Sequence, residues 1–376
     1  MKSAAWLLPF LALMAIPTAL ADAPTNFSLP DLAKSFWTET GLKFPSKALT
    51  EAVTRAKLPV LDAAGHRREI VLMAIANEFA FHRMFDIFLT SLSNITFKGA
   101  GGSEDNLARH LIINIMTNTG TDNCTAVAGK YGAICVPYGN SHFTLGTFHA
   151  FSNEFYGIGF IKTATILDGL TVGVDVLFLD ADQVVFKNPL PYILAREADV
   201  LVTGDCHNHL DSAPMDRLPQ IGNNIGLIYF RATAMVTRAV YNWCLWLANI
   251  AYLGGKPWDQ TTFAVIVEWV AADVTVRHMS IAMLRPDKFP FMCMGPCGCD
   301  LRNVPYYHWG KQPRRTADNT CEPALMREWY CYHMPCSGDM NNKAKLMEEY
   351  TVMYHKVIGP INSLSEPMTV LRPLAS

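Results

Sequence analysis

Charged residues are scarce in this sequence, and neither sign is in excess. Of the 376 residues, 17% are Asp, Glu, Lys or Arg, and the formal net charge is -2. Proteins that bind nucleic acid neutralise its phosphates with a surplus of Lys and Arg, which is missing here. We therefore expect no nucleic-acid partner, and an anionic ligand would have to be bound by a small local group of side chains.

The sequence has no internal repeat and no low-complexity tract, and its long uncharged apolar run lies near its start. This run, residues 4–20, follows Lys2 and ends beside Ala19 and Ala21, which is the order of features in a signal peptide. Its length also approaches that of a membrane-spanning helix. We predict that residues 1–21 are a signal peptide or an uncleaved membrane anchor. The rest of the chain then enters the secretory pathway, with the Golgi lumen as the expected location, or is secreted after cleavage.

Closely spaced pairs of Cys or His at the spacing of a zinc ribbon are also missing, although the chain has ten cysteines. An even number of cysteines in a secretory protein predicts disulfides. The pairings cannot be deduced, but a bond between Cys124 and Cys135 would close a short local loop. Asn26, Asn94 and Asn123 stand in Asn-x-Ser/Thr acceptor sequences for N-glycosylation, which fit the same compartment.

The chain divides by composition into four parts. Half of its residues are hydrophobic, which suffices for a sizeable buried core. After the N-terminal segment, residues 22–66 are weakly patterned and predict a stem or leader. Residues 67–356 are expected to form the catalytic domain, and residues 357–376 a C-terminal tail. From residue 289 onward the sequence is rich in Cys, Pro, Gly and aromatics, which predicts an irregular, disulfide-braced C-terminal lobe.

Apolar runs and helical spacing alternate along the catalytic domain. Because such alternation is typical of helices packed on both faces of a sheet, it predicts an α/β fold with a mainly parallel sheet. The apolar runs predict strands over residues 70–76, 111–116, 133–136, 174–179, 199–203, 225–230 and 274–278. Helical spacing predicts helices over residues 78–91, 121–131, 155–170, 233–253 and 342–355, and a further one from about residue 258.

Two carboxylates follow the strand predicted over residues 174–179. In an extended segment, residues two apart point the same way, so Asp180 and Asp182 can face one ligand. In open α/β sheets ligands bind beyond the carboxyl ends of the strands. Hard oxygen ligands suit Mn2+ or Mg2+, which would bind a diphosphate and assist its departure as a Lewis acid. The alternative is that one Asp caps a turn and the other is solvated.

These residues lie in stretches that resemble a known family, the nucleotide-diphospho-sugar transferases, which include plant rhamnogalacturonan xylosyltransferases and extensin arabinosyltransferases. The resemblance covers about residues 69–354 and is strongest over 162–260. It implies a GT-A fold, a nucleotide-sugar donor such as a UDP-sugar, a divalent cation, a glycan or glycoprotein acceptor, and a retaining outcome. The matching stretches are residues 176–190, 198–202 and 224–233, followed by Asp259-Gln260.

The resemblance also implies roles for single residues. Asp180 and Asp182 are similar to the carboxylates that contact the donor ribose and the metal, and Lys162 resembles a basic residue on the preceding helix. Asp259 and Gln260 resemble an acidic and amide pair near the reacting carbon, although Asp259 could instead cap a helix.

Asn224 and Gly226 resemble the segment beside the donor sugar. Gly226 could let the sugar approach the backbone, or it could only ease the twist of a strand. Asn77 ends the first predicted strand, where it could contact the base or ribose or could cap the next helix.

Two more residues are similar in place to C-terminal residues of the family. His333 resembles a metal-ligating histidine, and Gly338 and Lys343 follow in the order of a motif that meets the diphosphate. The spacing is wider than in the compact form of that motif. A buried His that only makes structural hydrogen bonds is the alternative for His333.

Two other functions remain open from the sequence. Asp180 could be the nucleophile of a haloacid-dehalogenase-like phosphatase, whose loop also follows an apolar strand. That loop normally follows the first strand of its domain, whereas here several predicted strands precede it. The chain could also be a non-catalytic nucleotide-sugar-binding protein, because a fold can be kept after turnover is lost.

Overall fold

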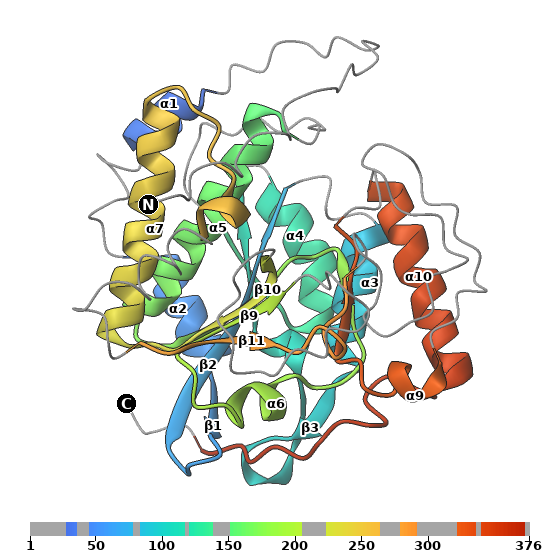
Figure 1. Cartoon of the computed structure of the whole chain (residues 1–376). Coiled ribbons are helices and arrows are strands. Elements are labelled where there is room, and N and C mark those ends of the chain that lie inside the picture. The colour runs from blue at the N-terminus through green and yellow to red at the C-terminus, as the bar shows by residue number, and fades with distance from the viewer. Residues whose placement is uncertain are drawn as a thin grey trace, which may run out of the picture.

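The computed structural model describes residues 28–35, 45–77, 83–116, 120–137, 151–204, 223–263, 279–291, 322–335 and 340–372. Within these residues, eight strands form one central sheet (Figure 1). Seven of them follow the order β11-β9-β10-β7-β2-β5-β6, and β1 pairs with β2. Their bounds are β1 Leu58–Leu61, β2 Arg67–Ala76, β5 Leu111–Ile115, β6 Ile134–Pro137, β7 Asp175–Leu179, β9 Val200–Gly204, β10 Asn223–Phe230 and β11 Ile281–Leu284.

The sheet is mainly parallel, as the sequence predicts. β7, β2, β5 and β6 run in the same direction, and β11 is parallel to β9. β10 runs antiparallel to both of its neighbours, β7 and β9, and β1 runs antiparallel to β2. Because of its direction, β10 begins at the edge of the sheet where β7 ends. Residues near 224–226 therefore lie beside the exit of β7.

The helices agree with the predicted helical spacing. The helices at the predicted positions are α3 (Arg83–Ser93), α4 (Gly120–Ala128), α5 (Asn153–Thr171), α7 (Ala234–Tyr252) and α10 (Met340–Val357). Side-chain caps fix two of their starts: the Ser152 hydroxyl accepts a bond from Phe155 N, and the Thr233 hydroxyl accepts one from Val236 N. The strand predicted over residues 274–278 lies outside the described residues.

Short elements complete the described chain. β8 and β12 form a separate two-stranded sheet, and so do β3 and β4. Their bounds are β3 Thr96–Lys98, β4 Glu104–Asn106, β8 Gln183–Val185 and β12 Cys331–His333. The short helices are α1 Leu29–Ser35, α2 Lys47–Ala56, α6 Leu190–Leu194 and α9 Pro323–Met326, with 3-10 turns η3 Ala100–Gly102, η4 Leu107–His110 and η5 Gly129–Tyr131.

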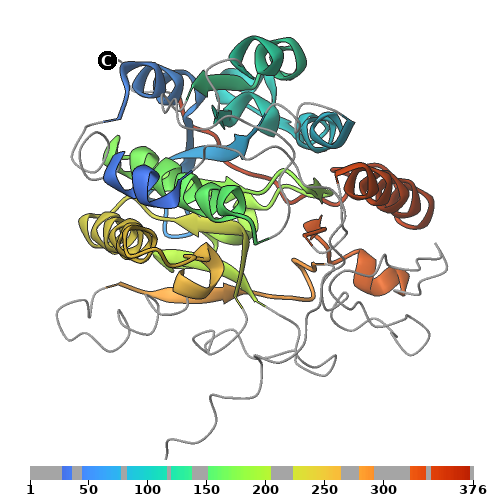
Figure 2. The same cartoon turned by 90° about the horizontal axis from the view of Figure 1, so that it is seen from above.

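The sheet lies between two helical layers, each with its own hydrophobic core (Figure 2). Successive residues of a strand point to opposite faces. On β2, Val71 and Met73 face the core that contains α1, α2, α5 and α7, and Leu72 and Ala74 face the core that contains α3, α4 and α10. Burial on both faces explains why β2 and β7 read as continuous apolar runs rather than as alternating ones.

The packed region extends beyond the predicted domain at both ends. In the segment expected to be a stem, α1 and α2 contribute to one core and β1 pairs with β2. In the predicted tail, Val370 forms a bridge with Val60, and Leu371 N donates to Pro59 O at 2.8 Å. Both segments are part of the packed fold because each supplies backbone or apolar groups to the sheet. The predicted signal or anchor segment lies outside the described residues.

The described cysteines bear out one predicted disulfide and leave the bracing of the C-terminal lobe a prediction. Cys124 and Cys135 form a disulfide between α4 and β6, as their spacing predicts. The C-terminal lobe, however, shows no disulfide among its described residues. Cys331, on β12, is a buried free thiol, as is Cys244 on α7. The other cysteines after residue 289 lie outside the described residues, so the predicted bracing of this lobe has no support in the part of the lobe that is described.

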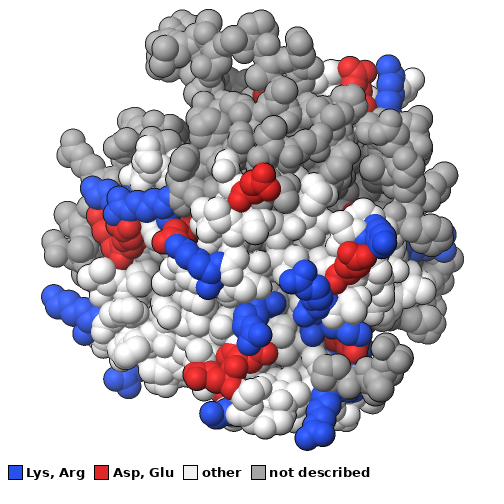
Figure 3. All heavy atoms as spheres, turned by 180° about the vertical axis from the view of Figure 1, so that it is seen from behind, with Lys and Arg blue, Asp and Glu red and all other residues white. Residues whose placement is uncertain are grey.

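The described surface on one face of the molecule carries mixed charge. On the face seen in Figure 3, acidic and basic side chains lie interspersed, and neither sign gathers into one large patch. A strong attraction to a polyanion needs a concentrated basic patch. Among the described residues, none of the helices is long and apolar enough to span a membrane.

Candidate metal and donor site

The site lies where β7 ends at the carboxyl edge of the sheet. Asp180 follows β7 directly, and β8 begins three residues later at Gln183. β8 pairs antiparallel with β12 in a register that places Gln183 opposite His333. This short pairing joins the loop after β7 to a segment from the far end of the chain. It brings His333 next to the two carboxylates.

Backbone groups hold the loop between β7 and β8. Asp180 N donates to Gly226 O at 2.7 Å, and Met334 N donates to Asp182 O at 2.9 Å. The Gln183 side chain is fully buried, and its Nε2 donates to Asp180 O at 2.8 Å and to Gly226 O at 3.1 Å. The loop is therefore tied to β10 on one side and to β12 on the other, which limits how far its carboxylates can move.

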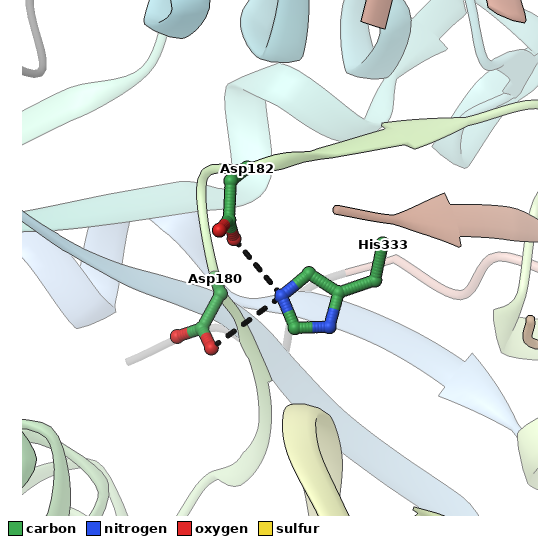
Figure 4. Close-up of side chains that lie close together, drawn as sticks. All are labelled: Asp180, Asp182 and His333. Carbon is green, nitrogen blue, oxygen red and sulfur yellow. Dashed lines mark hydrogen bonds and ion pairs between the residues drawn. The ribbon is translucent and has the colours of Figure 1, made fainter. Parts of the chain in front are cut away.

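Asp180, Asp182 and His333 converge on one point (Figure 4). One potential ligand atom of each lies within 4.8 Å of the others. His333 Nε2 is 2.9 Å from Asp182 Oδ1 and 3.8 Å from Asp180 Oδ2. His333 and Asp182 are buried, whereas the Asp180 side chain is 30% exposed. Two carboxylates and an imidazole fit a divalent cation, and the exposed side leaves room for oxygens of a substrate.

Two lysines neutralise the carboxylates. Lys343, on α10, donates to Asp182 Oδ2, and Lys162, on α5, donates to both carboxylate oxygens of Asp180 at 3.0 Å. Burial alone would raise the pKa of Asp182, but Lys343 and His333 outweigh it and hold that pKa well below its ordinary range. Asp182 is therefore ionised at neutral pH and is able to bind a cation.

Lys162 also links this group to Asp259. Lys162 is buried, and its Nζ is 4.0 Å from Asp259 Oδ2. Burial raises the pKa of Asp259, Lys162 opposes that shift, and the charge of Asp180 adds to it. A Cβ on Gly159 would lie 2.8 Å from both Cβ and Cγ of Asp259. The glycine on α5 is therefore what allows the Asp259 side chain to approach that helix.

Asn224 and Gly226, on β10, contact His333 directly. The Asn224 Oδ1 atom is 3.0 Å from His333 Nδ1 and accepts a bond from Gly226 N at 3.0 Å. A Cβ on Gly226 would lie 2.0 Å from His333 Cε1. The imidazole ring therefore occupies the space that a side chain at position 226 would need. This contact differs from both roles that the sequence suggests for Gly226.

The other predicted residues lie around this group. Asn77 is buried directly after β2, at the edge where β7 also ends. Gln260 is half-buried in the helical residues 259–263. Gly338 lies outside the described residues.

Gln183 and Gly159 were not found from the sequence. Gln183 stands one residue after Asp182, so its position in the sequence beside the two carboxylates could have marked it as a residue of the site. A glycine inside a helix such as Gly159 gives no such signal, because the side chain that it accommodates lies a hundred positions further along the chain.

The chain is similar to known proteins in family profile, in sequence and in structure. The profile of the nucleotide-diphospho-sugar transferase family matches residues 107–347, which is more than half of the chain. This chain belongs to that family. The GT-A type of fold that the resemblance implies agrees with the observed sheet and its helical layers. Membership in the nucleotide-diphospho-sugar transferase family gives no support to the phosphatase alternative.

Individual relatives match smaller parts or at lower similarity. The chain is 34% identical over 122 residues to "Arabinosyltransferase XEG113" of Arabidopsis thaliana, a segment that is 31% of this chain and 18% of that protein. It thus spans less than a fifth of the length of this relative. Mouse xyloside xylosyltransferase 1 is 12% identical, with a TM-score of 0.38, over 72% of this chain and 99% of that one. The galactosyltransferase LgtC is 12% identical, with a TM-score of 0.41, over 76% and 96%.

Proposed function

We propose that the protein is a metal-dependent glycosyltransferase. It moves a sugar from a nucleotide-diphosphate sugar, a UDP-sugar, to a glycan or glycoprotein acceptor and retains the anomeric configuration. One observation carries the proposal: Asp180, Asp182 and His333 converge at the exit of β7 in a chain of the nucleotide-diphospho-sugar transferase family. That edge of the sheet is where α/β proteins bind their ligands.

In this proposal the three converging residues hold Mn2+ or Mg2+. The imidazole favours Mn2+, because Mg2+ prefers a shell of oxygens and water. A bound cation would supply Lewis-acid assistance to the departure of the nucleoside diphosphate. Asp180 also binds the donor ribose and stays oriented by Lys162, and Lys343 turns from Asp182 to a phosphate oxygen. Asn77, Asn224 and Gly226 remain predicted contacts of the donor.

The reaction exchanges one bond at the anomeric carbon for another on the same face. The bond from that carbon to the phosphate oxygen breaks, and the acceptor oxygen bonds to the carbon. The hydroxyl proton of the acceptor passes to the departing phosphate. This proposal puts Asp259 and Gln260 beside the reacting carbon, and it is supported by Lys162 Nζ, which lies 3.0 Å from Asp180 Oδ1 and 4.0 Å from Asp259 Oδ2. Replacing Gln260 with Ala should lower kcat far more than donor affinity, and an inverted anomeric coupling in the proton NMR spectrum of the first-formed product would refute retention.

A donor screen tests the proposed activity. The full chain is incubated with a panel of nucleotide sugars, with and without Mn2+, and the released nucleoside diphosphate is measured. We expect release from a UDP-sugar that requires Mn2+ and is lost in Asp182→Asn. Tight binding of a nucleotide sugar without any release would favour a non-catalytic binding protein. A trapped aspartyl-phosphate on Asp180 would favour a phosphatase.

We also propose that the protein acts in the secretory pathway, in the Golgi lumen. The N-terminal apolar run supports this location, and so do the acceptor residues Asn94 and Asn123, which are both exposed. Removal of N-glycans from the protein expressed in a eukaryotic cell should increase its mobility on a denaturing gel. An unchanged mobility, together with cytosolic fractionation, would contradict the location.

A further inference from the structure

The hydrogen bonds of Asn224 fix the orientation of its side-chain amide. Gly226 N lies 3.0 Å from the atom of this amide that also faces His333. A backbone N–H can donate only to an acceptor, so that atom is the carbonyl oxygen and not the NH2 group. The pairing of β10 with β9 shifts register between Asn224 and Ile228, so Asn224 and Gly226 lie at an irregular part of the strand.

The orientation of Asn224 in turn fixes the state of Nδ1 in His333. His333 Nδ1 is 3.0 Å from the Asn224 oxygen, so Nδ1 must carry the proton. Nε2 faces the Asp182 carboxylate, which is also an acceptor, so without a metal Nε2 donates to it. When a cation takes the place of that proton, the proton kept on Nδ1 leaves the lone pair of Nε2 for the metal. Nε2 is the atom that faces Asp182 at 2.9 Å and Asp180 at 3.8 Å. The ring thus presents its ligating atom to the two carboxylates.

Gly226 fixes the position of the same ring. A Cβ at this position would lie 2.0 Å from Cε1, 2.4 Å from Nδ1 and 2.7 Å from Nε2 of His333. Real Cβ atoms do not approach other atoms so closely, so any other residue at 226 would push the ring away. On its other side, His333 is held by the pairing of β12 with β8. The imidazole is buried and packs against the backbone of β10 at Gly226.

We propose that Asn224 and Gly226 are positioning residues for His333, which they hold as an Nε2 ligand of the metal. The inference rests on the proposed function, because it assumes that a cation binds at this group. A partner that sets the tautomer of a ligating histidine typically changes metal affinity by about 10- to 100-fold. In this account the Asn224 oxygen binds the histidine, so a contact of Asn224 with the donor would be made by its NH2 group.

Metal affinity in the absence of donor separates this role from a donor contact. The Kd for Mn2+ is measured by electron paramagnetic resonance of the free ion, for wild type, Asn224→Leu and Asn224→Asp. Leu removes the acceptor oxygen, and we expect the Kd to rise about 10- to 100-fold. Asp keeps an oxygen in place, so we expect it to bind Mn2+ no more weakly than wild type. An unchanged Kd in Asn224→Leu would overturn the proposal.

A spectroscopic signature tests the tautomer itself. In the Co2+-loaded wild type, a histidine bound through Nε2 gives a hyperfine-shifted Nδ1–H proton resonance that exchanges slowly when it is hydrogen-bonded. We expect one such line, which is missing in His333→Gln and broadened by exchange in Asn224→Leu. Its absence from Co2+-loaded wild type would overturn the proposal even if Asn224→Leu failed to fold.

The Gly226→Ala variant supplies an independent test of the positioning role. Its added methyl should displace the ring and weaken Mn2+ binding at least as much as Asn224→Leu does. Thermal unfolding without metal establishes that each variant is folded. If wild type itself binds neither Mn2+ nor Co2+, the proposed metal dependence fails. If wild type binds Mn2+, and the variants Gly226→Ala and Asn224→Leu both bind it as tightly as wild type does, only the positioning role fails.

Discussion

Replacing Asp182 with Ala would leave two basic side chains without their counter-charge. In the metal-free protein the Asp182 carboxylate accepts a bond from Lys343 and lies 2.9 Å from His333 Nε2. The Asp182 and Lys343 side chains are 12% and 19% exposed. Breaking a buried ion pair by removing one partner costs about 3–5 kcal/mol. Because Lys343 keeps some contact with solvent, we expect a loss near the lower end, about 3 kcal/mol.

The structure changes an expectation drawn from the sequence alone. If the metal ion were the partner of Asp182, replacing Asp182 with Ala would leave the unfolding of the metal-free protein nearly unchanged. The ion pair between Lys343 and Asp182 predicts a loss of stability instead. Chemical unfolding in urea measures the difference in the free energy of unfolding between metal-free wild type and Asp182→Ala, with Asp287→Ala as a matched control. Asp287 pairs with Arg285, whose side chain is 39% exposed, so its loss should cost only about 0–1 kcal/mol.

A double variant and a ligand complete this test. Asp182→Ala with Lys343→Met removes the unpaired ammonium and should recover part of the stability. Mn2+ with UDP at about 100 times its Kd should stabilise wild type by about 2.7 kcal/mol, and it should not stabilise Asp182→Ala. The reasoning is refuted if metal-free Asp182→Ala is as stable as Asp287→Ala, or if ligand stabilises wild type and Asp182→Ala equally.

Three further predictions concern groups away from the metal ligands. Gly159→Ala should displace Asp259 and lower kcat on the order of 100-fold. Circular dichroism should show that α5 keeps its helicity, because Ala favours helices. An unchanged kcat would contradict the contact between Gly159 and Asp259. Replacing Cys124 and Cys135 with Ser should cost about 2–4 kcal/mol in urea unfolding, and equal stability of the two proteins would count against the disulfide. Burial raises the pKa of Asp168 to about 7, so the stability that its protonated form contributes is present below pH 4 and is lost as the pH rises through 7. Asp168→Asn should therefore be more stable than wild type at pH 8. A lower free energy of unfolding for Asp168→Asn at pH 8 would contradict this prediction.

The apolar runs carried most of the fold prediction. Strands β2, β5, β7 and β10 are buried on both faces, so their sequences are continuous apolar runs that can be found without a structure. Their directions are less evident, because the antiparallel course of β10 depends on how the chain returns to the sheet and not on its composition. The short strands β8 and β12 pair over a long sequence separation through three residues each. Such pairing leaves no local signal.

Several residues that lie together at the candidate site were named from the sequence. Asp180 and Asp182 could be found because two carboxylates follow a buried strand, and the family resemblance added His333 and Lys343. The contact of Lys343 with Asp182 could not be predicted, since it depends on how α10 packs beside α3. The ring of His333 against Gly226 was equally hidden. A glycine is compatible with many kinds of close approach, and only the folded chain shows which one occurs.

The dependence of donor cleavage on Mn2+, compared between wild type and His333→Gln, tests the central claim most directly. Metal-free protein is titrated with Mn2+ in the presence of the UDP-sugar selected by the donor screen, and the released UDP is measured. The account predicts that EDTA abolishes release by wild type, that Mn2+ restores it, and that His333→Gln needs a much higher Mn2+ concentration. Release that resists EDTA, or the same Mn2+ dependence in both proteins, would contradict the assignment of Asp180, Asp182 and His333 as the metal site.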